Sequence, residues 1–370
     1  MDQKFFLKTI VETESPSQDK AAVDRVGAIV AEQARKLGGQ VELISNQETG
    51  NHVLVRFASS KGMGGMDEGN KPILLLCHMD TVFPLGTFSK MPFREADGKI
   101  YGPGTLDMKS GIVIGLSAIE DARQRGMTRP VTLLCTSDEE IGSETSRTWI
   151  ESLARESALV LVLEPGMPDG SLKTWRKGVG DFTVNVRGRA AHAGGAHEMG
   201  RNAIEEMAHQ VIAIQKLTDY GRQTTLNVGV IRGGTVSNVV PEKAEIVVDV
   251  RVMQPGEWER LEDEMKNLKP VLEGTSIEVS GSLNRPPMPF NDLMNATFEK
   301  AKAIATRIGM DLKASGTGGG SDANFVAPFG IPVLDGLGAI GDGAHSDREF
   351  IHADSLFERS QLVSRLLTDW

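Results

Sequence analysis

The sequence has very little cysteine: Cys77 and Cys135 are the only two in 370 residues. Two isolated cysteines provide neither the paired spacing of a zinc finger nor the CxxC of a thiol redox site. Each lies inside a short apolar run, ILLLCHMD and VTLLCTSD, so we expect both thiols to be buried in strands. Metal ligation or nucleophilic catalysis by these thiols is the less favoured alternative.

The sequence also lacks long apolar runs and a positive net charge. No segment approaches the roughly 18 apolar residues that are required to span a bilayer. The N-terminal MDQKFFLKTIVETES contains no signal-peptide core. The formal net charge of −10 argues against general nucleic-acid binding, because phosphate contacts need a surplus of Lys and Arg. We therefore expect a cytoplasmic protein that binds neither membrane nor nucleic acid, while an anionic small substrate remains compatible with a local arginine.

The main pattern in the sequence is a series of short apolar runs separated by segments with helical periodicity. The expected strands buried on both faces are 51–57, 72–77, 131–136 and 158–163. Between two of them, 109–126 repeats apolar residues at helical spacing. This alternation predicts an α/β fold with a mainly parallel sheet flanked by helices. A helix at 293–308 and a strand at 331–338 continue the pattern.

The pattern changes between about 178 and 286. The expected order β-α-β-β-α-β, which is the ferredoxin-like α+β arrangement, covers 181–188, 201–217, 224–234, 242–252, 255–268 and 275–282. In the strand at 242–252, alternation places the apolar residues on one face under the helices and Arg251 on the other. We therefore expect one discontinuous domain, 1–177 plus 287–370, and one inserted domain, 178–286. A flexible hairpin or loop is expected at 62–70.

Histidines and carboxylates follow the predicted buried strands. They are His78, Asp80, Glu139, Glu140, Glu164 and His345. Sites in parallel α/β sheets form beyond the carboxyl ends of the strands. Two imidazoles with several carboxylates suit a pair of divalent cations, and Zn²⁺ fits this mixture of nitrogen and oxygen best, with Co²⁺ or Mn²⁺ as alternatives. Each residue taken singly has an ordinary structural explanation, such as an acidic run that interacts favourably with a helix dipole. These explanations do not account well for all six residues together.

Seven motifs resemble those of a known metallopeptidase family. They are HMDTV (78–82), YGPGTLDMKSG (101–111), SDEEIGS (137–143), EPG (164–166), AAHAG (190–194), GGGSDA (318–323) and GAHSD (343–347). The family includes glutamate carboxypeptidase, aminoacylase, acetylornithine deacetylase and succinyl-diaminopimelate desuccinylase. The resemblance covers nearly the whole chain, with the motifs in family order, and is greatest to the glutamate carboxypeptidases. It implies a zinc-exopeptidase-like catalytic domain and an inserted lid and dimerisation domain.

The resemblance also implies a role for each motif residue. Asp107 would bridge both metals, beside a cis peptide bond to Met108. His78 and Glu164 would complete one metal site, and Glu140 and His345 the other. Asp80 would hold the imidazole of His78, and Glu139 would act as general base on a water shared by the metals.

In the inserted domain, the resemblance implies that His192 reaches the active site of a partner subunit to stabilise the oxyanion, so a homodimer is expected. It further implies that Arg251, Asn238 and the backbone of Gly318 and Gly319 bind the substrate. An arginine can hold a free carboxylate with two parallel hydrogen bonds. A cross-strand salt bridge is the structural alternative for Arg251.

One departure concerns substrate selectivity. Glutamate carboxypeptidases usually carry a lysine shortly after the EP motif, and the equivalent position here is Ser171, with Lys173, Arg176 and Lys177 nearby. Strict selectivity for glutamate is therefore in question. The expected activity is release of a C-terminal amino acid, glutamate being one candidate, from a small peptide or N-acyl conjugate with a free carboxylate.

Two alternatives stay open at this point. One is an N-acyl-amino-acid deacylase or dipeptidase that uses the same site. The other is a catalytically silent family member that binds metal or ligand, and Glu139 beside a complete set of ligands argues against it. The sequence contains neither a GxSxG nucleophile elbow nor an HExxH zinc helix.

Overall fold

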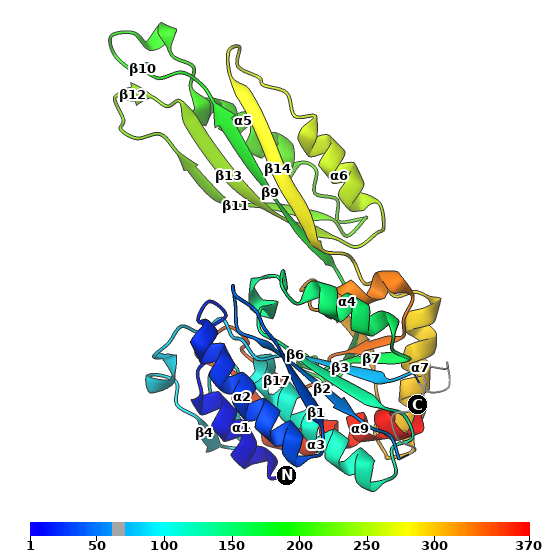
Figure 1. Ribbon diagram of the computed structural model, residues 1–370. Helices are drawn as coiled ribbons and strands as arrows, with labels where there is room; N and C mark the ends of the chain where they lie inside the picture. Colours follow the sequence, from blue (N-terminus) through cyan, green and yellow to red (C-terminus); the bar gives the residue numbers. More distant parts are fainter. Residues whose placement is uncertain (61–70) are drawn as a thin grey trace. The chain divides into compact units, whose positions relative to one another are not determined.

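The computed structural model describes residues 1–60 and 71–370, so the loop expected at 62–70 lies outside the described residues. The described chain forms two compact units. Unit 1 comprises Met1–Trp175, Phe290–Thr317 and Ser321–Trp370. Unit 2 comprises Arg176–Pro289 together with the three glycines Gly318–Gly320. Figure 1 labels many of the helices and strands of both units.

Unit 1 is built on an eight-stranded sheet among the described residues, in the order β1-β2-β6-β3-β7-β16-β8-β15. These strands are β1 (Gln40–Ile44), β2 (His52–Phe57), β3 (Ile73–His78), β6 (Val131–Thr136), β7 (Leu159–Val162), β8 (Leu172–Arg176), β15 (Ala314–Thr317) and β16 (Val333–Asp335). The central strands β6, β3, β7 and β16 are parallel, whereas β2 runs antiparallel to both of its neighbours. The predicted α/β class is confirmed, in a mostly parallel mixed sheet.

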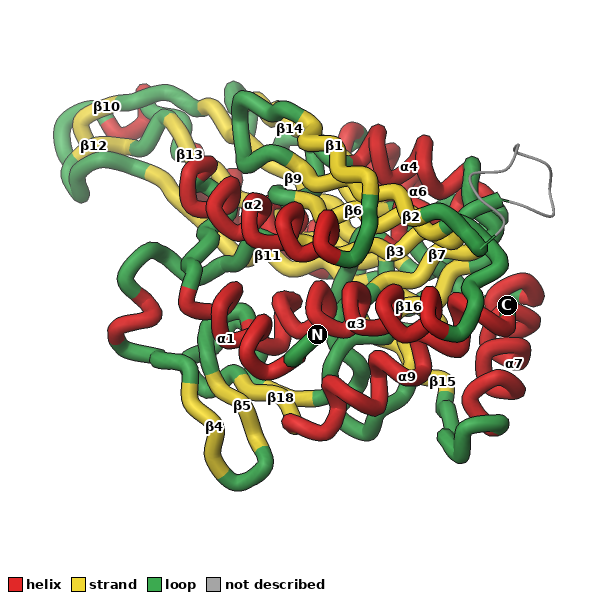
Figure 2. The backbone as a smooth tube through the Cα atoms, turned by 60° about the horizontal axis from the view of Figure 1, so that its bottom comes forward, coloured by secondary structure: helices red, strands yellow, loops and turns green. Residues whose placement is uncertain are grey.

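The central strands are apolar because helices cover both faces of the sheet. Every residue of β3 and β6 is buried, including the free thiols of Cys77 and Cys135, as predicted. The covering helices are α1 (Gln3–Glu12), α2 (Lys20–Lys36), α3 (Ser110–Gln124), α4 (Arg147–Arg155), α7 (Asp292–Thr306), α8 (Ala323–Val326) and α9 (Ala353–Asp369). Figure 2 shows α3 and α9 packed side by side.

A second, smaller sheet in unit 1 joins residues 94–101 to the C-terminal part of the chain. Its order is β17-β18-β5-β4, with β4 (Arg94–Ala96), β5 (Lys99–Tyr101), β17 (Gly341–Asp342) and β18 (Phe350–His352). Phe350 pairs with Tyr101, and Ile351 pairs with Ile100. This pairing holds the loop between β17 and β18 beside the segment that follows β5.

Unit 2 has the expected β-α-β-β-α-β order. Its elements are β9 (Gly178–Arg187), α5 (Ala203–Gln215), β11 (Thr225–Gly233), β13 (Lys243–Val252), α6 (Glu257–Lys266) and β14 (Ser276–Arg285), with the short pair β10 (Ala191–His192) and β12 (Val239–Val240). The sheet order is β11-β13-β9-β14 and all its pairs are antiparallel. This topology agrees with the predicted ferredoxin-like arrangement.

Alternation along the strands of unit 2 explains how its helices pack. Phe182, Ile246 and Leu261 belong to one buried cluster. The ring of Phe182 stacks on Trp258 of α6 at a centroid distance of 4.8 Å. At Gly180 a Cβ atom would lie 2.4 Å from this indole ring, so the packing requires glycine there. Within the described part of the chain, no helix combines the length and apolar character needed to cross a membrane.

Candidate metal centre

Four parallel neighbours in the sheet of unit 1 carry the predicted ligands other than Asp107 at or beyond their carboxyl ends. His78 is the last residue of β3. Glu164 follows β7, and Glu140 follows β6 in a short 3-10 turn, Glu139–Ile141. His345 lies in the loop that follows β16 and β17, with a left-handed φ of 61°. The carboxyl ends of parallel strands share one edge of the sheet, which brings these side chains together.

Asp107 lies between the two histidines. It belongs to the turn Thr105–Lys109 that leads into α3, in which the backbone of Asp107 and Met108 is not helical, and its peptide bond to Met108 is cis, as expected. Its Oδ1 atom lies 3.1 Å from Nε2 of His78, and its Oδ2 atom lies 3.3 Å from Nε2 of His345. Each oxygen of one carboxylate therefore faces a different imidazole.

Glu164 and Glu140 complete the two sides of this arrangement. Oε1 of Glu164 is 3.6 Å from Nε2 of His78, and Oε2 of Glu140 is 3.2 Å from Nε2 of His345. Ligand atoms of His78, Asp107 and Glu140 lie within 4.8 Å of one another, as do those of His78, Glu139 and Glu164. These two groups share His78, while Asp107 connects His78 to His345 through its two oxygens.

The chemistry of this cluster fits divalent cations. Oε1 of Glu140 is buried and has no hydrogen-bond partner among the described residues, although a buried carboxylate oxygen normally has one. Hydrogen bonds to Asp107 and Glu140 raise the pKa of His345 to about 10. Burial raises the pKa of Glu140, because desolvation disfavours its charged form. The cluster therefore attracts positive charge, and its nitrogen and oxygen donors are those that Zn²⁺ accepts.

Asp80 contacts more than the imidazole that it was expected to hold. Its backbone oxygen is 3.0 Å from Nδ1 of His78, and its Oδ1 is 3.5 Å from the same atom. The carboxylate also accepts hydrogen bonds from the backbone N–H groups of Glu139 (3.3 Å) and Glu140 (3.2 Å) and from the hydroxyl of Ser17 (2.7 Å). Asp80 therefore connects the end of β3 to the turn that carries Glu139 and Glu140.

Glu349 is a buried carboxylate that sequence reasoning missed. It is fully buried and accepts hydrogen bonds from the backbone N–H groups of Gly104, Leu106 and Asp107. Burial raises its pKa to about 7 against the opposing effect of these donors. A glutamate ahead of a short strand resembles a surface residue in the sequence, and backbone donors leave no sequence signal. The only sequence feature that could have indicated this position is its four-residue separation from His345.

The predicted residues of unit 2 fall into two groups. His192 in β10 and Asn238 before β12 form the first, where the backbone N–H of Ala193 donates to the carbonyl of Asn238 at 2.9 Å. Nδ1 of His192 accepts hydrogen bonds from the backbone N–H groups of Gly194 (3.1 Å) and Gly195 (3.0 Å). In the neutral ring the proton is therefore on Nε2, which makes Nε2 a donor.

The second group is at the other end of β13. Arg251 donates from Nε (2.9 Å) and Nη2 (2.8 Å) to the carboxylate of Asp249, and from Nη1 to the carbonyl of Gly318 (3.3 Å). Asp249 and Arg251 lie on the same face of one strand, so this ion pair is not the cross-strand bridge considered as the alternative. The carbonyls of Gly319 and Gly320 accept from Nη1 of Arg176. These carbonyl contacts attach the three glycines to unit 2.

The two groups of unit 2 lie far apart within the unit. β10 and β12 are at the end of the sheet where β13 begins at Lys243, and Figure 1 shows them at its extremity. From Lys243 to Arg251 an extended strand spans roughly 27 Å. His192 and Arg251 of one chain are therefore too distant to contact one small molecule.

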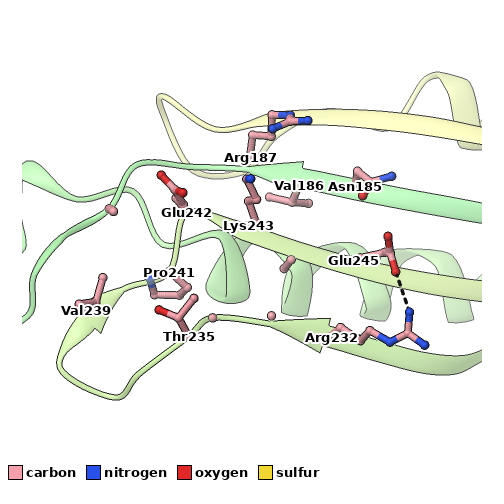
Figure 3. Close-up of a pocket in the computed structure, with 14 residues that line it drawn as sticks. Asn185, Val186, Arg187, Arg232, Thr235, Val239, Pro241, Glu242, Lys243 and Glu245 are labelled. Atoms are coloured by element: carbon pink, nitrogen blue, oxygen red, sulfur yellow. Dashed lines mark hydrogen bonds and ion pairs between the residues drawn. The ribbon is translucent and has the colours of Figure 1, made fainter.

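A separate pocket of about 450 Å³ lies on unit 2, near the start of β13, and Figure 3 shows the side chains that line it. Side chains of both charges line it, among them Arg187, Lys243 and Glu242, and Arg232 pairs with Glu245 at 3.4 Å. None of the predicted site residues is among those that line it. Its exposed, mixed charges favour solvation over a defined ligand.

Comparisons with known proteins agree with this geometry. Residues 74–369 match the description "Peptidase family M20/M25/M40". The chain is 30% identical over 374 residues to carboxypeptidase G2 of Pseudomonas sp. (strain RS-16), covering 98% of this chain and 88% of that protein.

Two solved structures share the fold. The aminopeptidase PepT of Bacillus cereus ATCC 10987 superposes with a TM-score of 0.80 at 23% identity, covering 100% of this chain and 99% of that one. The YXEP protein of Bacillus subtilis, described as a dinuclear metal-binding peptidase of the M20 family, gives 0.69 at 15% identity, covering 99% and 98%. Because the family match covers most of the chain and carboxypeptidase G2 is 30% identical over nearly all of it, the chain belongs to peptidase family M20/M25/M40.

Proposed function

We propose that this chain is a dinuclear metal-dependent exopeptidase, most simply with Zn²⁺, that releases a C-terminal amino acid from a small peptide or N-acyl conjugate. The observation that carries the proposal is the carboxylate of Asp107, whose two oxygens each face a different imidazole. His78 and Glu164 would hold one cation, and Glu140 and His345 the other. When bound, the cations supply a water of lowered pKa and polarise the scissile carbonyl.

Glu139 is the proposed general base. Its side chain is near His78 and Glu164, and its backbone N–H is held by the carboxylate of Asp80. Glu139 takes the proton from the attacking water and returns it to the leaving amine. In this arrangement Asp80 positions the base as well as the ligand beside it.

The oxyanion donor is proposed to come from a second subunit. The extended strand from Lys243 to Arg251 spans roughly 27 Å, and His192 lies in β10 near the Lys243 end, so two chains are needed if both residues serve one active site. A homodimer is further supported by β11, an edge strand of the unit-2 sheet among the described residues. Ile231 of β11 is 60% exposed and Ile212 of the adjoining α5 is 58% exposed, and an apolar strand edge of this kind favours pairing.

Arg251 is proposed to bind the free carboxylate of the substrate. Asp249 fills the side of the guanidinium formed by Nε and Nη2, which leaves the Nη1 side to the substrate and to Gly318. Burial and the positive charge of Arg251 lower the pKa of Lys177, so two cationic groups are close together here. This concentration of positive charge suits a carboxylate-terminated substrate, and a second carboxylate such as that of glutamate would add to the attraction.

The proposal is tested with one hydrolysis panel on purified protein. N-acyl amino acids with a fixed acyl group and C-terminal Glu, Asp, Leu or Arg are compared with their C-terminal amides and with free dipeptides. We expect hydrolysis of the free acids, loss of activity with a chelator, recovery with Zn²⁺ or Co²⁺, and little turnover of the amides. Glu139→Gln should retain both metals and lose about 10²- to 10⁴-fold in kcat. A Glu139→Gln protein as active as the parent would contradict the mechanism, and equal turnover of acids and amides would contradict the carboxylate requirement.

A further inference from the structure

Glu349 connects the two loops that supply Asp107 and His345. It lies four residues after His345 and immediately before β18. Its Oε1 accepts from the backbone N–H groups of Leu106 (2.6 Å) and Asp107 (3.0 Å), and its Oε2 accepts from that of Gly104 (3.0 Å). All three donors belong to the segment that ends at the carboxylate shared by both sides of the metal centre.

The placement of this carboxylate is energetically demanding. Glu349 is fully buried and it lies close to the negative charge of Asp107, which raises the free energy of its charged form. Three backbone N–H donors offset this cost only while the backbone of residues 104–107 keeps its observed conformation. Conversely, the segment keeps the N–H groups of Leu106 and Asp107 directed at one oxygen, which fixes the backbone from which the Asp107 side chain projects.

We propose that Glu349 is a positioning residue for the dinuclear centre, which orients the bridging carboxylate of Asp107 and keeps it in register with His345. This inference rests on the metal centre proposed above. The pairing of β18 with β5 brings the segments that carry His345 and Asp107 near each other. It does not reach Asp107, because strand pairing ends at Tyr101 and Phe350. The hydrogen bonds of Glu349 extend this connection to Asp107 itself.

The isosteric variant Glu349→Gln separates positioning from side-chain volume. A glutamine offers one acceptor oxygen, so its NH₂ group would face either the N–H of Gly104 or those of Leu106 and Asp107. Partners that orient metal ligands typically change metal affinity by about 10- to 100-fold when they are lost. We therefore expect Glu349→Gln to bind Co²⁺ at least ten-fold more weakly than the parent in titrations of metal-free protein.

Unit 2 offers a matched control in Glu206. It is also fully buried, and its two oxygens accept from the backbone N–H groups of Val271 and Leu272 and from the side chains of Gln210 and Thr275. Glu206→Gln thus removes a carboxylate of the same kind from a segment that carries no proposed ligand. We expect it to bind Co²⁺ as the parent does, whatever it does to stability.

The titrations and the visible spectrum of the Co²⁺-loaded proteins decide the matter. The proposal is supported if the parent binds two Co²⁺ while the Glu349→Gln variant binds Co²⁺ more weakly and has an altered d–d spectrum. Two Co²⁺ bound by the variant with parental affinity and spectrum overturn it and leave the metal centre intact. A parent that binds no pair of metals overturns the metal centre itself.

A second measurement uses the parent alone and does not depend on the folding of a variant. Amide hydrogen exchange is compared with and without Zn²⁺. If Glu349 links the loops, metal should slow exchange at Gly104, Leu106 and Asp107 together with the segment 343–351. Unchanged exchange at these three amides, in a protein that binds two metals, would overturn the inference.

Discussion

The carbonyl oxygen of Asp80 lies 3.0 Å from Nδ1 of His78, whereas the nearer carboxylate oxygen of Asp80 lies 3.5 Å from that nitrogen. The backbone of Asp80 therefore makes the shorter contact to the imidazole and can fix its tautomer. The carboxylate is left to accept from the backbone of Glu139 and Glu140. One residue thus orients a ligand on β3 and the turn after β6.

Because the backbone and the carboxylate of Asp80 have different partners, Asp80→Asn tests the role of the carboxylate alone. Asparagine keeps the backbone carbonyl and the side-chain volume but has one acceptor oxygen, so at least one amide of the 139–140 turn loses its partner. We expect metal affinity to fall about 10- to 100-fold, measured by Zn²⁺ titration with a competing chelator.

Ser17→Ala is the matched control, because it leaves both amide contacts of this carboxylate in place and removes only the hydroxyl, which donates to it at 2.7 Å and to the carbonyl of Thr81 at 3.4 Å. We expect it to change stability by about 1 kcal/mol and metal affinity by less than three-fold. An Asp80→Asn protein with parental metal affinity would show that the amide contacts do not position the turn.

Subunit mixing tests whether His192 serves a partner. In a mixed dimer of Glu139→Gln and His192→Ala chains, only the site of the His192→Ala chain has its base and can receive an intact His192 from the other subunit. Each pure variant should be nearly inactive, while random mixing should restore about one quarter of parental activity. The readout is the hydrolysis rate after the two proteins are mixed and allowed to exchange subunits.

Recovery in this experiment also requires a dimer, which sedimentation measures separately. Ile231→Lys, at the exposed edge strand β11, should be monomeric and should not complement. If the mixture remains inactive although the parent is dimeric, His192 does not act across the subunits.

Asp249 and Arg251 are expected to have opposite effects on substrate binding. Arg251→Ala should raise KM for free acids about 10- to 100-fold, because a charge-assisted hydrogen bond is lost, and should leave the metal content unchanged. Asp249→Asn removes part of the negative charge that neutralises the guanidinium. Its side chain is 44% exposed, so screening keeps the effect small. We expect KM to fall about two- to five-fold.

C-terminally amidated substrates serve as the control for both variants, since neither substitution should change the low turnover expected for them. A rise in KM for Asp249→Asn as large as that for Arg251→Ala would show that Asp249 acts by orienting Arg251. Metal loss in Arg251→Ala would show that Arg251 belongs to the metal centre.

The parts of this protein that the sequence predicts are those in which side-chain identity carries the signal. Apolar runs predict the buried strands, and the polar residues after them predict the cluster around Asp107. Strand direction is not encoded in such runs, so the antiparallel β2 was not foreseen. The sequence also does not predict the contacts of Glu349 and of the Asp80 carboxylate. Their partners are mainly backbone N–H groups, which every residue except proline has.

Glu257 at the start of α6 predicts how unit 2 responds to acid. Hydrogen bonds from Arg260 and Arg222 lower its pKa from 4.5 to about 2. The folded state then binds fewer protons than the unfolded state between these values. The stabilisation from Glu257 is therefore complete above pH 4.5 and disappears as the pH falls to about 2. Glu257→Gln should cost about 1–2 kcal/mol at pH 7, since both arginines are partly exposed, and progressively less below pH 4.5.

The measurement is urea unfolding at pH 7, 5 and 3.5, followed by the fluorescence of Trp258, with the other three tryptophans replaced by phenylalanine. Glu259→Gln is the control, because Glu259 occupies the same helical turn but is exposed. The difference between parent and Glu257→Gln should be equal at pH 7 and 5 and smaller at pH 3.5, while Glu259→Gln should follow the parent throughout. If the difference in unfolding free energy between the parent and Glu257→Gln grows as the pH falls, the pH dependence has the opposite sign. An ionised Glu257 paired with arginines would then not be the origin of the difference.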